Sequence, residues 1–112
     1  MTEDLKKELI DNIEYYGVSN QRDVLNREYK ELQDELYYLE DEGNYRDNLL
    51  SECVDVINVV LQFLYSCGFT DEEFEKEFKY KVYRQKHRRE EEKQNEQKHR
   101  KFRTFSYTKR FP

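Results

Sequence analysis

The sequence has few of the residues that interrupt helices. Its 112 residues include three glycines, no tryptophan and a single proline, which is the last residue. Since proline and glycine are the strongest breakers of regular structure, long uninterrupted helices are expected. Only two cysteines are present, Cys53 and Cys67, near opposite ends of one predicted helix. They cannot pair with each other, so we expect reduced core thiols.

The sequence also lacks a long uncharged apolar run. A membrane span needs about 18 or more apolar residues, and the only candidate, residues 49–64, is interrupted by Glu52 and Asp55. The first residues, Met-Thr-Glu-Asp, are acidic and unlike the apolar centre of a secretory signal. We therefore expect a cytoplasmic protein with no membrane contact.

Charge is abundant and unevenly distributed. Charged residues make up 40% of the chain and hydrophobic ones 36%, so one modest domain with a thin core is expected, and oligomerisation is the usual remedy. Residues 1–83 hold 9 Lys/Arg and 21 Asp/Glu, a net charge of 9 − 21 = −12. Residues 84–112 hold 11 and 4, a net charge of 11 − 4 = +7. The body and the tail therefore differ in kind.

The three glycines divide the body into helices. Gly17, Gly43 and Gly68 each suit the left-handed conformation that follows a helix end. Their positions predict an all-α bundle of four helices, at about 3–16, 20–42, 44–67 and 71–84 or beyond.

Residues at the predicted helix starts agree with this division. Thr70 and Glu73 have the spacing of a capping box at the start of the fourth helix. Ser19 or Asn20 could cap the second helix, and Asn44 the third.

Two acids, Glu52 and Asp55, stand in the most apolar segment of the chain. At a spacing of three they share one face of a helix, and a helix that is apolar nearly all round belongs in a core. Burying an unpaired carboxylate is costly, and a divalent cation would remove both the burial penalty and the mutual repulsion. The alternative is a buried salt bridge, with Arg46, Lys76 or Lys81 as the cation.

A second acidic pair, Glu28 and Glu31, has the same spacing on the second helix. Taken alone, this pair fits a solvated helix face. Around Gly43, however, the second and third helices should form an antiparallel hairpin, which brings both pairs to similar heights. Four carboxylates converging from two helices suit Mg²⁺ or Mn²⁺ better than zinc.

The order of these residues resembles a known signature. Glu28-x-x-Glu31, then 20 residues, then Glu52-x-x-Asp55 is similar to the ExxE–spacer–ExxD signature of the all-α NTP pyrophosphohydrolases. That superfamily includes MazG, the dimeric dUTPases and the dCTPases. Residues 13–88 look most like small phage-type MazG-like members, which implies a host cytoplasm as the location. Lys81-Val-Tyr-Arg84 resembles the KxxR of their final helix.

The resemblance implies a function. Glu28, Glu31, Glu52 and Asp55 would bind Mg²⁺, with Mn²⁺ as a substitute, and Lys81 and Arg84 would hold phosphate oxygens. The enzyme would convert a nucleoside triphosphate to its monophosphate and pyrophosphate. It would do so as a homodimer or homotetramer of four-helix units. Gln21 and Asn58 are candidate contacts to base or sugar, each with the alternative of a plain helix amide.

Two features depart from the family. Arg27 stands where relatives often have another glutamate, and the tail has no counterpart among them. We therefore divide the chain into a pyrophosphohydrolase-like domain, 1–88, and a basic aromatic tail, 89–112. The tail could bind nucleic acid, a partner protein or the acidic body of this chain, and a non-catalytic helical interaction protein is the second reading. Its aromatic residues are Phe102, Phe105, Tyr107 and Phe111. The two histidines of the chain, His87 and His99, are expected to be exposed.

Overall fold

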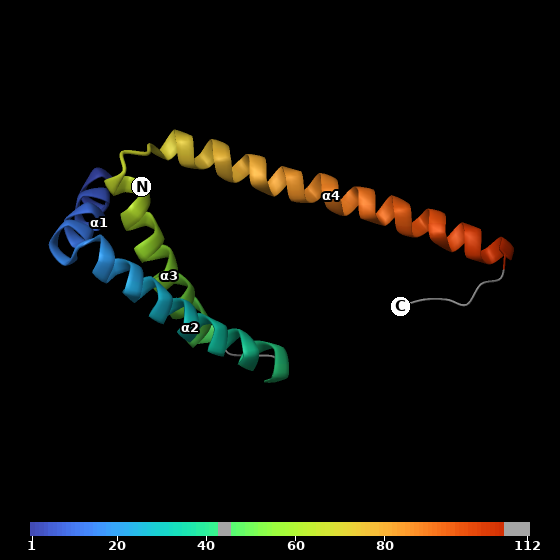
Figure 1. The fold of residues 1–112 in the computed structure, drawn as a ribbon, viewed down its shortest axis with the longest axis horizontal. Helices are drawn as coiled ribbons and strands as arrows, with labels where there is room; N and C mark the ends of the chain where they lie inside the picture. The colour runs from blue at the N-terminus through green and yellow to red at the C-terminus, as the bar shows by residue number, and fades with distance from the viewer. Residues whose placement is uncertain (43–45, 107–112) are drawn as a thin grey trace. The chain divides into compact units, whose positions relative to one another are not determined.

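The computed structural model describes the backbone of residues 1–42 and 46–106, and the side chains of residues 1–39 and 48–100. All secondary structure in these ranges is helical, which confirms the all-α prediction (Figure 1). The helices are α1 (Glu3–Tyr16), α2 (Val18–Glu42), α3 (Arg46–Ser66) and α4 (Asp71–Ser106).

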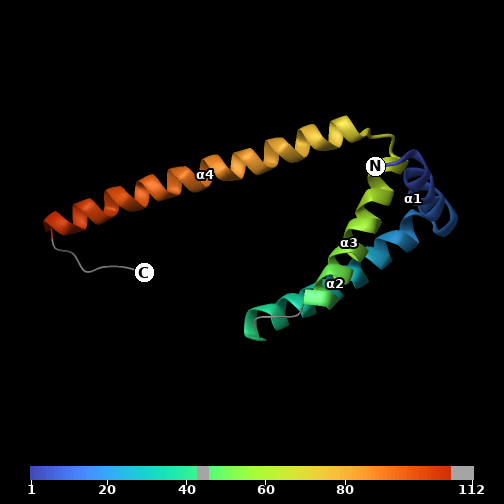
Figure 2. The ribbon, with the colours of Figure 1, turned by 180° about the vertical axis from the view of Figure 1, so that it is seen from behind.

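The first compact unit of the chain is Met1–Asp71. Within it α1, α2 and α3 pack on one another, and α3 returns antiparallel along α2 (Figures 1 and 2). This arrangement is the hairpin that the short connection around Gly43 predicts. Among the described side chains the buried apolar core is small, as the composition predicts, and consists of Leu9, Ile13, Val59 and Tyr65.

Glycine ends two of the helices as predicted. Gly17 has φ of 91° and Gly68 has φ of 87°, values that favour glycine over residues with a side chain. The amide of Gly17 donates to the Ile13 carbonyl at 2.8 Å and so closes α1. Gly43 and the proposed cap Asn44 lie outside the described residues.

The start of α2 differs from the prediction. The helix begins at Val18, so Ser19 and Asn20 lie inside it and cap nothing. The carbonyl of Gly17 already accepts from the amide of Gln21 at 3.0 Å, because the positive φ of Gly17 reverses the chain within one residue. The start of α4 at Asp71, directly after Thr70, is where the sequence predicts it.

Asp71 connects both ends of the first unit. It accepts a hydrogen bond from the Tyr65 hydroxyl and pairs with Lys6 Nζ at 2.8 Å. The hydrogen bonds from Lys6 and Tyr65 lower the pKa of Asp71, and the bond to Asp71 raises the pKa of Lys6. The first residue of α4 is thereby attached to α1 and to the end of α3.

The second compact unit begins at Glu72 and consists of the rest of α4. Every side chain from Glu72 to Arg100 is exposed, including both histidines, as predicted. Ion pairs between residues four apart follow the helix: Glu75–Lys79 at 3.1 Å, Glu77–Lys81 at 3.7 Å, Lys86–Glu90 at 4.0 Å and His87–Glu91 at 3.1 Å. The domain boundary at 88/89 stays a prediction, and the four tail aromatics lie outside the described side chains.

The two cysteines are free, as predicted. Cys53 is half-buried, whereas Cys67 is exposed, so the expectation of a core thiol is wrong for Cys67. The reason is that α3 ends at Ser66, which leaves Cys67 in the connection before α4.

One helix has the length and composition of a membrane span. Asn48–Ser66 has a mean hydropathy of 1.4, and 17% of that window is buried. Core helices of soluble proteins can have the same length and hydropathy, and this helix carries two acids, Glu52 and Asp55. The expected absence of a membrane contact stays a prediction.

Candidate metal centre

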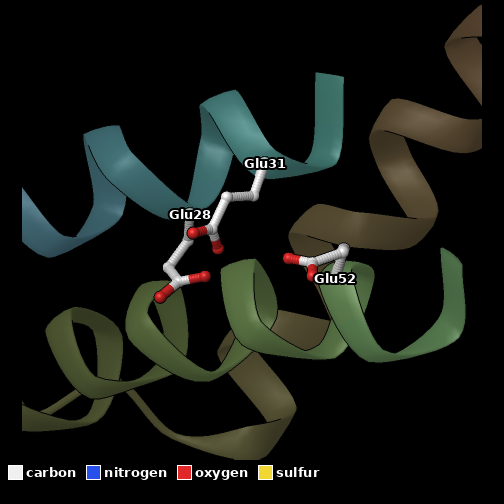
Figure 3. A group of neighbouring side chains, drawn as sticks. All are labelled: Glu28, Glu31 and Glu52. Atoms are coloured by element: carbon white, nitrogen blue, oxygen red, sulfur yellow. The ribbon is translucent and has the colours of Figure 1, made fainter. Parts of the chain in front are cut away.

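Three of the four predicted carboxylates converge between α2 and α3. Glu28 and Glu31 project from α2 and Glu52 projects from α3 toward them (Figure 3). One carboxylate oxygen from each lies within 4.8 Å of the others. The pairing follows from the antiparallel hairpin, in which residues equally far from the turn come to the same height. The structure therefore brings together three of the four acids that the sequence places on two separate helices.

Burial leaves part of this cluster without hydrogen-bond partners. Glu28 and Glu52 are half-buried, and Glu31 is exposed. The Oε2 atoms of Glu28 and Glu52 are shielded from solvent and accept no hydrogen bond. An orphaned carboxylate oxygen is costly unless a proton, a donor or a cation satisfies it.

The crowding of negative charge is visible in the pKa of Glu28, which is raised to about 7. The main cause is a hydrogen bond between the carboxyl groups of Glu28 and Glu31, which can form only when one of the two is protonated. Burial comes next, followed by the negative charges of Glu31, Asp55 and Glu52. Without a cation, the cluster therefore retains a proton well above the pH at which a free glutamate loses it.

The pKa of Glu52 is also raised, first by burial and then by the charges of Glu31, Asp55 and Glu35. Asp55 is half-buried and lies outside the set of three converging carboxylates. Its charge nevertheless acts on both Glu28 and Glu52. Asp55 is thus a neighbour of the cluster and has no ligand atom in it.

The structure also bears on the salt-bridge alternative. Among the described side chains of Met1–Asp71, no lysine or arginine forms an ion pair with Glu52 or Asp55. The side chain of Arg46 lies outside the described residues. Lys81 pairs with Glu77 of its own helix at 3.7 Å. Pairing with Lys76 or Lys81, both on α4, stays open.

These residues fit a hard divalent cation. All the possible ligand atoms are carboxylate oxygens, and two of these carboxylates have a buried oxygen without a hydrogen-bond partner. Among the described residues, the repulsion between the carboxylates is relieved by a retained proton. Mg²⁺ is held by a few carboxylates and keeps several waters, which matches three carboxylates beside open solvent. Glu28, Glu31 and Glu52 are the residues that could hold it.

An open pocket of about 680 Å³ adjoins the cluster. Glu31 and Glu52 line it together with two further acids and two tyrosines: Asp34, Glu35, Tyr37 and Tyr38. Glu35 is a residue that the sequence analysis did not single out, and its Oε2 atom is buried without a hydrogen-bond partner. Its spacing of four from Glu31 on α2 was the signal available for it.

The two amides proposed as base or sugar contacts belong to one network. Gln21 is buried, donates to Gln62 Oε1 at 2.8 Å and accepts from Asn20 at 2.9 Å. Gln62, also buried, donates in turn to Asn58 Oδ1 at 2.9 Å. Gln21 is therefore a buried amide whose oxygen and amino group both form hydrogen bonds within the protein, which matches the alternative of a plain helix amide. Asn58 is exposed, and its side-chain oxygen accepts the hydrogen bond from Gln62.

Gln62 is the second residue that the sequence analysis missed. It lies on the face of α3 that also carries Glu52, Asp55 and Val59, at successive spacings of three, four and three. The position of Gln62, a polar residue on the face of α3 predicted to be buried, indicates a side chain that needs a hydrogen-bond partner inside the protein. The network fixes α2 against α3 near the carboxylates.

The predicted phosphate-binding residues lie on α4. Both are exposed, and each cation stacks on the Tyr80 ring, at 5.9 Å for Lys81 Nζ and 5.4 Å for the Arg84 guanidinium carbon. They are accessible to a phosphate, but they belong to the second unit of the chain.

Comparison with protein-family models, with curated proteins and with solved structures finds no match. The resemblance to the all-α NTP pyrophosphohydrolases stays a prediction from the motifs.

Proposed function

We propose that the chain is a Mg²⁺-dependent nucleotide pyrophosphohydrolase. The observation that carries this proposal is the convergence of Glu28, Glu31 and Glu52 within 4.8 Å, with buried oxygens that have no partner. The substrate would be a nucleoside or deoxynucleoside triphosphate. Water would cleave the bond between its α and β phosphates, which gives a monophosphate and pyrophosphate.

In this proposal the carboxylates have two tasks. Glu28, Glu31 and Glu52 hold Mg²⁺, which supplies positive charge against the phosphate chain. A neighbouring carboxylate orients the attacking water and takes its proton. We assign this second task to Asp55; the support is that its charge acts on Glu28 and Glu52 while it lies outside the converging group.

The remaining substrate contacts come from two places. Lys81 and Arg84 would donate charge-assisted hydrogen bonds to phosphate oxygens. The pocket beside the cluster, which Tyr37 and Tyr38 line, would receive the nucleoside. We propose that two or four chains assemble MazG-like four-helix bundles, which would provide the core that one chain lacks.

The proposal is tested with the purified full chain and each of the common NTPs and dNTPs, with and without Mg²⁺. Release of monophosphate and pyrophosphate is followed. We expect Mg²⁺-dependent release that falls by roughly 100-fold or more in Glu52→Gln, beyond the cost of losing an outer-shell partner. The matched control is Asp23→Asn, which removes an exposed acid of α2 away from the cluster and should leave the rate unchanged. Folded protein that releases nothing from any nucleotide in Mg²⁺ would refute the hydrolase.

The exposure of α4 favours a second candidate, a helical interaction protein. All described side chains from Arg84 to Arg100 are exposed, and this segment opens the part of the chain with net charge +7. Such a helix could bind nucleic acid through phosphate contacts, with affinity that falls steeply as salt rises. Thermal stabilisation by Mg²⁺ that is lost in Glu52→Gln separates the two candidates, because only the hydrolase requires the cation in its native state.

A further inference from the structure

The face of α3 opposite its buried side is apolar from Leu50 to Leu64. Leu50, Val54 and Ile57 have exposed fractions of 68%, 50% and 52%. Leu61 and Leu64 continue the same face and are half-buried. We call these five residues the α3 outer stripe. An exposed apolar patch of this kind on a small protein marks an interaction surface.

The spacing within the α3 outer stripe defines the kind of partner. Its residues follow one another at four, three, four and three positions, which is the seam of a coiled coil. The flanking positions are Ser51, Cys53, Asn58 and Val60, none of which is charged. The stripe therefore fits another helix with an equally long apolar seam.

Charge favours a second copy of this chain on this face. Met1–Asp71 contains 6 Lys/Arg and 17 Asp/Glu, a net charge of 6 − 17 = −11. Two such units repel over their charged faces. The α3 outer stripe and its flanks carry no charge, so two copies can approach there without placing acids opposite acids.

Other occupants match the stripe less well. On α4 the comparable seam starts with Phe74 and Phe78 but continues with Lys81 and Gln85, so it offers two apolar positions against five. A helix that lies on a lipid surface carries Lys and Arg on its polar face, whereas α3 carries Glu52 and Asp55 on the face opposite the stripe. A second α3 presents five apolar positions and no acid on the facing side.

We infer that the α3 outer stripe is the surface on which two copies of this chain pair, α3 against α3. This pairing does not depend on hydrolase activity, because it uses the side of α3 opposite the carboxylate cluster.

Sedimentation equilibrium of the full chain tests the pairing. The parent protein should be a dimer, and Ile57→Glu should weaken it by roughly 30-fold or more, as expected for a residue at the centre of an interface. Ile57→Leu is the matched control and should stay dimeric. Unchanged helix content by circular dichroism shows that Ile57→Glu still folds, which is expected because Ile57 is half-exposed.

A charge-reversal experiment asks whether the stripe meets itself. Ile57→Glu and Ile57→Lys should each be monomeric, and mixing them should restore a dimer containing one copy of each. Three results would overturn the inference. They are a monomeric parent, a dimer that Phe78→Glu dissociates but Ile57→Glu does not, and binding to phosphatidylcholine vesicles that Ile57→Glu abolishes.

Discussion

The helices of Met1–Asp71 bury side chains against one another, whereas α4 from Glu72 to Arg100 exposes every side chain. Both regions are helical, but the sources of their stability differ. In the first region Ile13 and Val59 pack in a core; in the second, ion pairs such as Glu75–Lys79 support the helix locally. Packing can force carboxylates together, and a solvated helix cannot. The candidate metal centre accordingly lies in the first region.

The largest expected effect comes from a core substitution. Ile13→Ala should lower the free energy of unfolding by about 2–5 kcal/mol, because it removes buried methyl groups and leaves a cavity. Val82→Ala on exposed α4 should change it by less than about 0.5 kcal/mol. Urea denaturation followed by circular dichroism measures both. Equal costs for the two variants would show that α4 is packed as tightly as the first region.

The buried amide network should have the next largest effect. Gln62→Leu leaves the Gln21 amino group without an acceptor and should cost about 1–3 kcal/mol of stability. The double variant Gln21→Leu/Gln62→Leu should cost less than the sum of the two single changes, because it removes the Gln21 donor and the Gln62 acceptor together. Strictly additive costs in the same denaturation experiment would contradict the described hydrogen bond.

The carboxylate cluster should make stability depend on pH in a way that α4 does not. Glu28 has a pKa of about 7 in the folded chain and an ordinary value of 4.5, so between these values the folded state holds the extra proton. In Mg²⁺-free buffer, stability should therefore fall as pH rises from 5 to 7.5. Asp71 acts outside this window, because its pKa is lowered from 3.8.

Thermal melts at several pH values in this range measure the effect. Glu28→Gln should flatten the profile, since its amide has no proton to lose. Mg²⁺ should raise the melting temperature of the parent protein most at pH 7.5. A profile that rises with pH in the parent would be incompatible with a proton held in the cluster.

The smallest effect is expected on α4. Glu75→Gln removes the ion pair with Lys79 and should cost about 0.3–0.5 kcal/mol at low salt. The difference should vanish in about 1 M NaCl, where screening acts within a few ångströms. Thermal melts of both proteins at the two salt concentrations measure it, and a salt-independent loss would mean that Glu75 has a packing role.

Much of the fold follows from local rules. Gly17 and Gly68 end helices as predicted because a positive φ is a property of single residues. The convergence of Glu28, Glu31 and Glu52 also follows, because a short turn sets the register of the two helices. The predicted start of α2 at about residue 20 is wrong. The helix begins at Val18, directly after Gly17, whose carbonyl accepts the first hydrogen bond.

Other features depend on neighbours that one segment does not reveal. The partner of Gln62 lies 41 residues away on α2, so no local spacing shows it. The Oε2 atom of Glu35 is buried, although the spacing of four between Glu31 and Glu35 is equally typical of a solvated helix face. Asp55 has the predicted spacing from Glu52, but its carboxylate is not among those that converge within 4.8 Å, and spacing along one helix does not reveal this.

Asp71 has a mechanical consequence. It is the first residue of α4, and it is held by Lys6 of α1 and Tyr65 of α3. A pull on α4 is therefore transmitted to α1 through the ion pair with Lys6, and to the end of α3 through the hydrogen bond with Tyr65 as well as along the chain. Asp71→Asn would remove the charge that pairs with Lys6, and so weaken the attachment of α4 to α1 without shortening α4.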